Sequence, residues 1–262
     1  MRGFALAAVV FTALPAASQE PRGLCAERPG LATPPCTVDA GHLQVETGIG
    51  DWTHERNSVE RTDRVTVGET ELRYGVNDEI EARVGWTPYG WVRTRDRLAD
   101  ETDRESGTGD LTIGVKANPI DLGALSFALL PFATAPTGQR PIGAGDWGFG
   151  LLAPIAYELL EGVELEVTPE VDAAVDEDRT GRHVAFGGPV GLDVDVTKHI
   201  SIAAEVAAVR DHDPSGHSTS VLAGFSAGWR PSDDWQLDLG VNLGLNRNTP
   251  DVELYAGVAK WF

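Results

Sequence analysis

Alternation of apolar and polar side chains is the feature that most constrains how this chain can fold. Between Val163 and Val175, apolar side chains hold almost every second position, and Glu, Asp and Thr fill most positions between them. The same alternation runs from Trp235 to Asn246 and again from Asp251 to Val258. Because successive side chains of a strand point to opposite faces, each segment predicts a strand with one apolar and one polar face.

Segments of this kind recur along the whole chain from residue 43 onward. Twelve strands are predicted, at 43–51, 65–74, 79–89, 109–117, 125–135, 146–158, 163–175, 183–195, 200–210, 218–230, 235–246 and 251–262. The connectors mostly alternate between short ones, such as 159–162, and long ones, such as 90–108. An even number of strands with this alternation is typical of an up-and-down antiparallel transmembrane β-barrel. A soluble β-sandwich or soluble barrel is the alternative.

Three features favour the membrane barrel. The polar face is rich in Gly, Asp and Glu, as expected of a wet lumen, and the last strand ends on an aromatic residue, Phe262, which we interpret as an assembly signal read by the barrel-assembly machinery. Rings also gather at two levels, as in interfacial girdles. Trp52, Trp86, Tyr89, Trp91 and Trp147 lie near long connectors, and Tyr74, Tyr157, Trp229, Trp235 and Trp261 lie near short ones.

Five prolines oppose this interpretation, because each removes a ladder hydrogen bond from a closed sheet. They are Pro88, Pro131, Pro154, Pro169 and Pro189, and all fall inside predicted strands. A barrel therefore requires them at bulges or beyond the hydrocarbon band.

The first eighteen residues have the pattern of a secretory signal. Arg2 precedes an apolar stretch from Phe4 to Leu14, and small residues follow. We therefore expect a signal peptide at 1–18, an N-terminal periplasmic segment at 19–42 and an outer-membrane barrel at 43–262; a buried N-terminal helix is the alternative for the start. Cys25 and Cys36 are the two cysteines. In an exported chain they predict a structural disulfide.

Charge excludes one class of partner. The chain carries 40 acidic and 21 basic residues, a formal net charge of −19. Phosphate binding needs surplus cations, so we expect no nucleic-acid partner. No run of 18 apolar residues is present to form a transmembrane helix. We expect no cofactor, no bound metal and no catalytic residues.

Fifteen charged residues share the polar parity of their strands and are predicted to line the pore. They are Arg73, Glu79, Glu81, Arg83, Asp110, Lys116, Glu164, Glu166, Glu170, Asp172, Asp193, Asp195, Glu205, Asp238 and Glu253. One interpretation is a polar pore in which a basic stripe faces an acidic wall and sets the charge preference. The alternative is a set of mutual salt bridges that fills the lumen, since twelve strands fall between filled and open barrels.

One connector carries residue types that resemble a hydrolase. Asp211, His212, Asp213, Ser215 and His217 crowd together, but no Gly-x-Ser-x-Gly elbow is present and the connector is short. A weak cation site from Asp211, Asp213 and His217 is an alternative use of these side chains.

Several pieces of the chain resemble the family described as the MetA-pathway of phenol degradation. They are Thr33–Glu46, Glu71–Gly75, Gly107–Lys116, Pro131–Gly138 and Asp251–Phe262. The resemblance extends from about Arg28 to the end and implies a transporter-like outer-membrane barrel that passes small aromatic or other small solutes. The assembly signal departs from the usual pattern, because Lys260 stands where an apolar or aromatic residue is usual.

The predicted function is thus an outer-membrane channel of a Gram-negative bacterium for small solutes, and the resemblance implies aromatic compounds among them. Outer-membrane lipid and lipopolysaccharide are its expected surroundings. A structural barrel, or an outer-leaflet barrel enzyme without a transport role, is the alternative.

Overall fold

The computed structural model describes residues 22–262, so the predicted signal at 1–18 lies outside the described residues. The regular elements are β1 (Leu43–Arg56), β2 (Glu60–Val67), β3 (Glu69–Asn77), β4 (Ile80–Trp86), β5 (Tyr89–Asp96), β6 (Glu101–Gly107), β7 (Leu111–Asp121), β8 (Leu125–Ala135), β9 (Gly148–Leu152), β10 (Ile155–Leu160), β11 (Val163–Val167), β12 (Glu170–Val175), β13 (Arg182–Thr197), β14 (Ile200–Asp211), β15 (Ser218–Ser232), β16 (Trp235–Gly244) and β17 (Val252–Trp261). In the part described, no helix is long and apolar enough to span a membrane.

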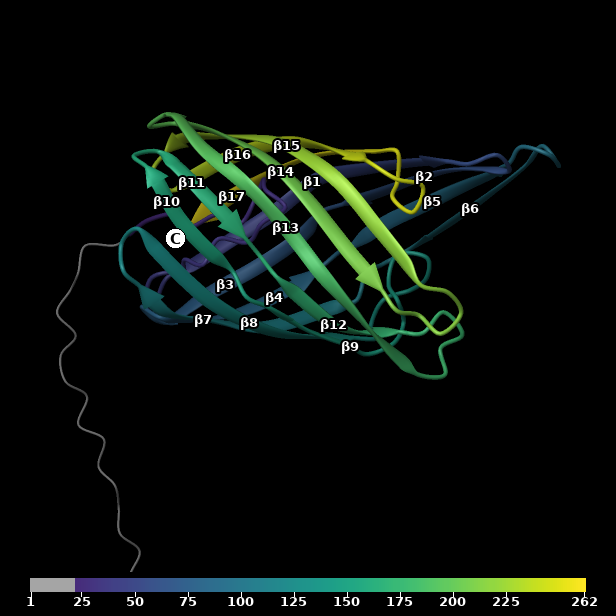
Figure 1. Ribbon diagram of the computed structural model, residues 1–262, viewed down its shortest axis with the longest axis horizontal. Coiled ribbons are helices and arrows are strands. Elements are labelled where there is room, and N and C mark those ends of the chain that lie inside the picture. Colours follow the sequence, from purple (N-terminus) through teal and green to yellow (C-terminus); the bar gives the residue numbers. More distant parts are fainter. Residues whose placement is uncertain (1–21) are drawn as a thin grey trace, which may run out of the picture.

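These elements form one closed antiparallel barrel of twelve strands (Figure 1). Five long strands are each interrupted once, so that β2–β3, β4–β5, β6–β7, β9–β10 and β11–β12 are end-to-end pieces of single barrel strands. The sheet closes because β1 pairs with β17 along its length. Each predicted strand coincides with one barrel strand, so the predicted architecture is confirmed.

The interruptions explain how the wall accommodates its prolines. Pro88, Pro154 and Pro169 lie between the pieces of interrupted strands, whereas Pro131 and Pro189 lie within β8 and β13. The carbonyl of Pro154 still accepts a hydrogen bond from the Ala128 amide of the neighbouring strand. Each proline therefore removes one backbone hydrogen-bond donor from the barrel wall but keeps its carbonyl acceptor.

The exposure pattern is the inverse of that of a soluble protein. On β16, Leu237, Leu239 and Leu243 point outward and are 38%, 63% and 40% exposed. Their inward neighbours Gln236 and Asp238 are only 2% and 6% exposed. An apolar exterior around a polar interior suits a barrel whose outer surface contacts lipid, and the fold is that of an outer-membrane barrel.

The aromatic residues occupy both ends of this exterior, with one exception. Trp86, Tyr89 and Trp147 are exposed at the end with long loops, and Tyr74, Tyr157, Trp229 and Trp235 at the end with short turns. Trp261 was expected in the second girdle, but it lies opposite Gln44 on the inward face and stacks on His42 at 4.3 Å. Lys260 lies opposite Trp235, and its ammonium group pairs with Asp234 in the adjacent turn.

Two predicted connectors are in fact strands. The segment 52–64 continues β1 to Arg56 and forms the first part of β2, and the segment 90–108 forms most of β5 and all of β6. Together they make a sheet that projects beyond the barrel at the end with long loops (Figure 1). Both faces of this sheet carry charged residues. The apolar alternation that marks the other strands is therefore absent, which explains why the sequence did not predict it.

Candidate functional site

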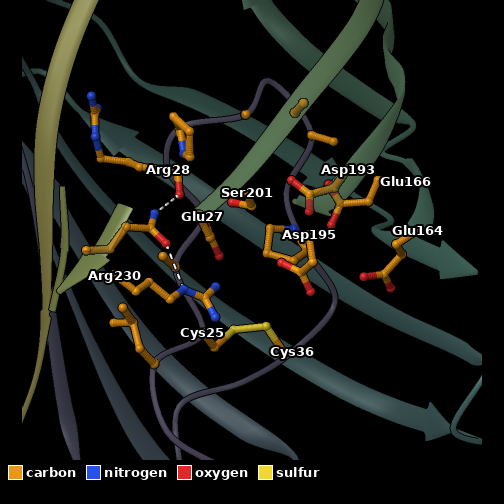
Figure 2. Close-up of a pocket in the computed structure, with 18 of the residues that line it drawn as sticks. Cys25, Glu27, Arg28, Cys36, Glu164, Glu166, Asp193, Asp195, Ser201 and Arg230 are labelled. Atoms are coloured by element: carbon orange, nitrogen blue, oxygen red, sulfur yellow. Dashed lines mark hydrogen bonds between the residues drawn. A yellow bond between two sulfur atoms is a disulfide. The ribbon is translucent and has the colours of Figure 1, made fainter. Parts of the chain in front are cut away.

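We predicted a periplasmic segment at 19–42, and the structure describes its residues 22–42. The stretch from Cys25 to Cys36 lies in the lumen of the barrel. A disulfide joins Cys25 and Cys36, which confirms their pairing and closes a loop, residues 25–36, that we call the plug loop (Figure 2). Inward side chains bind its backbone. Glu205 on β14 accepts hydrogen bonds of 2.7 Å from the amides of Leu31 and Ala32.

Ion pairs tie the plug loop to the basic side chains of the lumen. The Glu27 carboxylate lies 2.6 Å from Lys116 on β7 and 2.5 Å from Arg83 on β4. Arg73 on β3 contacts Glu81 at 2.9 Å and Glu46 at 2.8 Å. The expected basic stripe is therefore neutralised by nearby carboxylates. On this wall, the alternative of mutual salt bridges describes the structure.

A second set of contacts fixes the opposite side of the plug loop. The Arg28 guanidinium pairs with Asp238 on β16 at 3.0 Å. The backbone carbonyl of Arg28 accepts a hydrogen bond of 2.6 Å from the side-chain amide of Gln236. The Tyr255 hydroxyl donates to the Pro29 carbonyl at 2.6 Å. Asp238 and Glu205, both predicted to line a pore, thus hold the plug in place.

The wall formed by β11 and β13 differs in its charge. Glu164, Glu166, Asp193 and Asp195, which we call the acidic wall, have no lysine, arginine or histidine within ion-pair distance among residues 22–262. Together with the plug loop and Arg230 they line a cavity of about 340 Å³ (Figure 2). We call it the periplasmic-side cavity, because Asp195 and Gln236, among its lining residues, lie close to short turns.

A smaller cavity of about 220 Å³ lies on the other side of the plug loop. Glu46, Glu69 and Glu71 of β1 and β3 line it, and we call it the outer-side cavity. Four plug residues, Glu27, Arg28, Gly30 and Ala32, line both cavities. The tip of the plug loop therefore lies between the two cavities.

The remaining predicted residues have other placements. Glu79 is exposed in a short turn. Asp110 accepts amide hydrogen bonds from Gly138 and Ala144 and so fixes the long loop between β8 and β9. Glu253 accepts a hydrogen bond of 2.8 Å from Asn242. Glu170 and Asp172 lie on β12, where Asp172 is the cross-strand neighbour of Gly150.

Several residues that hold the plug were not predicted from the sequence. Gln44 and Glu46 on β1 accept or donate hydrogen bonds with the backbone of the plug loop. Their signal was present, because both share the polar parity of the predicted strand at 43–51. Glu27 and Arg28 lie in a segment without periodicity, where no pattern distinguishes a plug from a linker.

The outer connector with hydrolase-like residues has a different organisation from the one considered. His217 stacks on His212 at 4.9 Å and is not grouped with the aspartates. His183 on β13 instead lies between Asp176 at 2.9 Å, Asp211 at 3.1 Å and Asp213 at 3.4 Å. The Asp176, His183 and Asp213 side chains are close enough for one cation to contact all three.

The family model described as "Putative MetA-pathway of phenol degradation" matches residues 26–261, almost the entire described chain. The chain belongs to this phenol-degradation MetA family. No curated protein is significantly similar to it.

Solved structures share the fold at low sequence identity. The COG4313 outer membrane channel from Pseudomonas putida F1 is 16% identical, with a TM-score of 0.68 over 87% of this chain and 98% of that one. The NanC porin is 9% identical, with a TM-score of 0.52 over 83% and 98%. The translocator domain of autotransporter NalP from Neisseria meningitidis is 14% identical, with a TM-score of 0.52 over 84% and 88%.

Pieces that resemble the phenol-degradation MetA family meet one another in the structure. Gly109 and Gly138 come from two such pieces, and a side chain on Gly138 would lie 2.5 Å from the Gly109 carbonyl carbon. A side chain on Gly75 would collide with the Asp39 carbonyl, where the N-terminal segment crosses β3. These glycines therefore permit close backbone contacts, one at an outer loop and one where the segment enters the lumen.

Proposed function

We propose that this protein is an outer-membrane channel for small solutes, whose path runs between the plug loop and the acidic wall. The observation that carries the proposal is the periplasmic-side cavity of about 340 Å³, which lies inside a closed barrel. Its volume falls at the lower end of the range of small-molecule sites. A path of this size favours small solutes over polymers.

The lining charge supports neutral or cationic solutes. Four carboxylates face this cavity with no basic side chain of the described residues within ion-pair distance, and Arg230 is the one lining cation that no carboxylate of the described residues pairs with. Fixed carboxylates in a narrow wet lumen concentrate cations and repel anions. The family description names phenol degradation, which supports small neutral aromatic compounds among the solutes.

Transport, not catalysis, is the activity that we propose. The Ser215 hydroxyl donates to the Glu177 carboxylate at 2.5 Å, while His212 and His217 stack on each other. No serine–histidine pair is thus arranged for proton transfer in this connector. We further propose that the terminal strand ending at Phe262 is read by the barrel-assembly machinery.

A structural barrel without transport is the second candidate, and one observation favours it. The plug loop contacts three sides of the lumen and separates the two cavities, so the barrel in this state has a partition across its interior. A channel requires that the tip of the plug loop shifts enough to join the cavities.

Liposome swelling separates the two candidates. Refolded protein in liposomes should admit small neutral solutes and exclude larger sugars, with a rate that rises when the plug loop is loosened. Heat-denatured protein added to the same liposomes is the control. Liposomes that stay impermeable with folded protein, and also with a variant lacking the plug segment, would establish the structural barrel.

A further inference from the structure

The sheet that projects beyond the barrel separates its charges by face. Asp51 lies opposite Tyr255, whose hydroxyl reaches the plug loop, and this pair marks the inward face. Trp52 therefore points outward, together with its cross-strand neighbours Val65 and Trp91. Following this register outward from the barrel assigns every charged residue of the sheet to one face.

The outward face is basic and the inward face acidic. Outward lie Arg56, Arg61, Arg93, Arg95 and Arg104, which we call the arginine face, with Asp63 as the one carboxylate among them. Inward lie Glu55, Glu60, Asp96, Glu101, Asp103 and Glu105, with Arg64. In a chain with a net charge of −19, five arginines on one small surface are not expected by composition.

The register also places like charges directly opposite one another. Arg61 faces Arg56 on one side and Arg95 on the other, and Arg93 faces Arg104. Such cross-strand pairs destabilise a sheet. Partial relief comes from Asp63, 3.3 Å from Arg61, and from Asp100, 2.6 Å from Arg95. A further anion on this face would turn the remaining repulsion into attraction.

The position of the arginine face identifies the anion. Trp91, at the base of the face, belongs to the outer aromatic level, and the Arg104 guanidinium lies over its ring at 4.6 Å. Arg93 and Arg95 follow Trp91 by two and four residues, which is roughly 7 and 14 Å along an extended strand. Because aromatic belts of membrane proteins sit at the headgroup level, arginines that follow Trp91 outward are expected among the headgroups of the outer leaflet or just beyond them. Arginine recognises phosphate through paired hydrogen bonds.

We propose that the arginine face binds the phosphate groups of lipopolysaccharide in the outer leaflet. The occupant is a lipid because the face is continuous with the lipid-facing aromatic level and points away from the lumen. The proposal rests on the orientation of the barrel and not on channel activity, so the two can fail independently. It assigns a function to a projecting sheet that the permeation path does not use.

Lipid A with two phosphates and its monophosphoryl form are the probes. Binding to refolded protein in detergent is measured by native mass spectrometry and by titration. The double variants Arg61→Gln/Arg95→Gln and Arg93→Gln/Arg104→Gln should each bind diphosphoryl lipid A about tenfold more weakly, because each removes charged hydrogen bonds to phosphate. The wild type should discriminate between the two lipids, and the variants should lose this discrimination.

The matched control is Arg140→Gln/Arg247→Gln, which removes the same charge from exposed loops. It should bind lipid A as the wild type does. The thermal midpoint without lipid is a second readout. It should stay equal or rise in the Arg61→Gln/Arg95→Gln variant, because repulsion between opposed arginines is removed.

Four results would overturn the proposal. The variants could bind lipid A like the wild type, or the loop control could lose as much affinity as they do. The variants could also unfold at a lower temperature without lipid, which would make the arginines structural. Finally, a soluble glucosamine phosphate could compete at the same concentration as lipid A, and the occupant would then not be a lipid.

Discussion

The Lys116 ammonium lies 2.6 Å from the Glu27 carboxylate, at the point where the plug loop meets β7. The same group donates hydrogen bonds to the carbonyls of Pro34 and Cys36, at 3.0 and 2.8 Å. Its side chain is fully buried. One lysine thus binds both arms of the plug loop, and three of our predictions concern how the lumen depends on such fixed charges.

Replacing Lys116 by methionine should release the plug loop. Glu27 would lose one of its buried partners, and breaking a buried ion pair costs about 3–5 kcal/mol. Compared with the wild type, we expect this variant to have a larger single-channel conductance and to unfold at a lower urea concentration. Lys198→Met, in an exposed short turn, is the matched control and should change neither quantity. Unchanged conductance in Lys116→Met would show that the plug does not limit the path.

Removing the disulfide should loosen the plug without opening the barrel. Cys25 and Cys36 are separated by 11 residues, and closure of a loop of this size is worth about 3 kcal/mol. Cys25→Ser/Cys36→Ser should therefore show larger or more variable conductance. The folded barrel should still migrate differently from boiled protein on a mild detergent gel. Loss of that difference would mean that the disulfide is needed by the barrel itself.

Charge on the lipid face should be costly, and charge on the lumen side should be tolerated where no partner is lost. Leu239→Arg places an arginine on an outward position that is 63% exposed and should cost about 2–4 kcal/mol in refolding. Asp195→Arg, on the acidic wall, should refold normally. Asp238→Arg should impair folding because it opposes Arg28 of the plug. Equal damage at positions 239 and 195 would contradict the assignment of the two faces.

The acidic wall should make the channel prefer cations. The variant Glu164→Gln/Glu166→Gln/Asp193→Asn removes three of its four carboxylates and should abolish the preference in a salt gradient, measured as the reversal potential. The preference of the wild type should fade between 0.1 M and 1 M salt, as the Debye length falls from about 10 to about 3 Å. Preference for anions in the wild type would instead assign selectivity to Arg73 and Arg83.

Protonation of His183 should hold two outer loops together, the one between β12 and β13 and the one between β14 and β15. Burial alone would lower the pKa of His183, but the hydrogen bonds that its ring donates to Asp176 and Asp211, together with the charges of Asp211 and Asp213, outweigh it and raise the pKa. Because the folded pKa is raised, the stabilisation is complete below the unfolded pKa and is lost as pH rises through the folded value. Protease cleavage within these loops should therefore increase with pH above that value.

One variant tests this role of His183, and a second variant is its control. In His183→Asn the cleavage rate, corrected for the activity of the protease, should no longer vary with pH. His217→Asn should retain the dependence, because His217 stacks on His212 and contacts none of the three aspartates that flank His183. A wild-type cleavage rate that does not vary from pH 5 to 8 would contradict the role of His183.

The barrel could be predicted from the sequence because lipid requires apolar side chains and the lumen requires polar ones, at alternate positions of each strand. Leu239 and Asp238 show this directly, since each is placed by parity alone. The projecting sheet was missed for the same reason, because around Arg61 and Arg95 both faces carry charged residues and no apolar alternation remains. The second predicted strand, at 65–74, is interrupted at Gly68, whose positive φ of 75° marks the junction between β2 and β3.

The plug loop could not be predicted from the sequence, for a different reason. Its contacts join positions that are far apart, such as Leu31 with Glu205 and Arg28 with Asp238, and no periodic pattern links them. The polar parity of Arg83 and Lys116 was recognisable, but their partner Glu27 lies in a segment without regular structure. An inward charge predicts that a partner exists in the lumen, not which segment supplies it.

The plug segment runs directly into β1, and β1 is the strand that closes the barrel against β17. This continuity dictates an order of assembly. Once β1 and β17 have paired, the barrel wall surrounds the plug loop, and a folded oxidase no longer has room to act on Cys25 and Cys36 within the lumen. We therefore expect the disulfide to form, and the oxidised loop to take its place in the lumen, before this last seam is sealed.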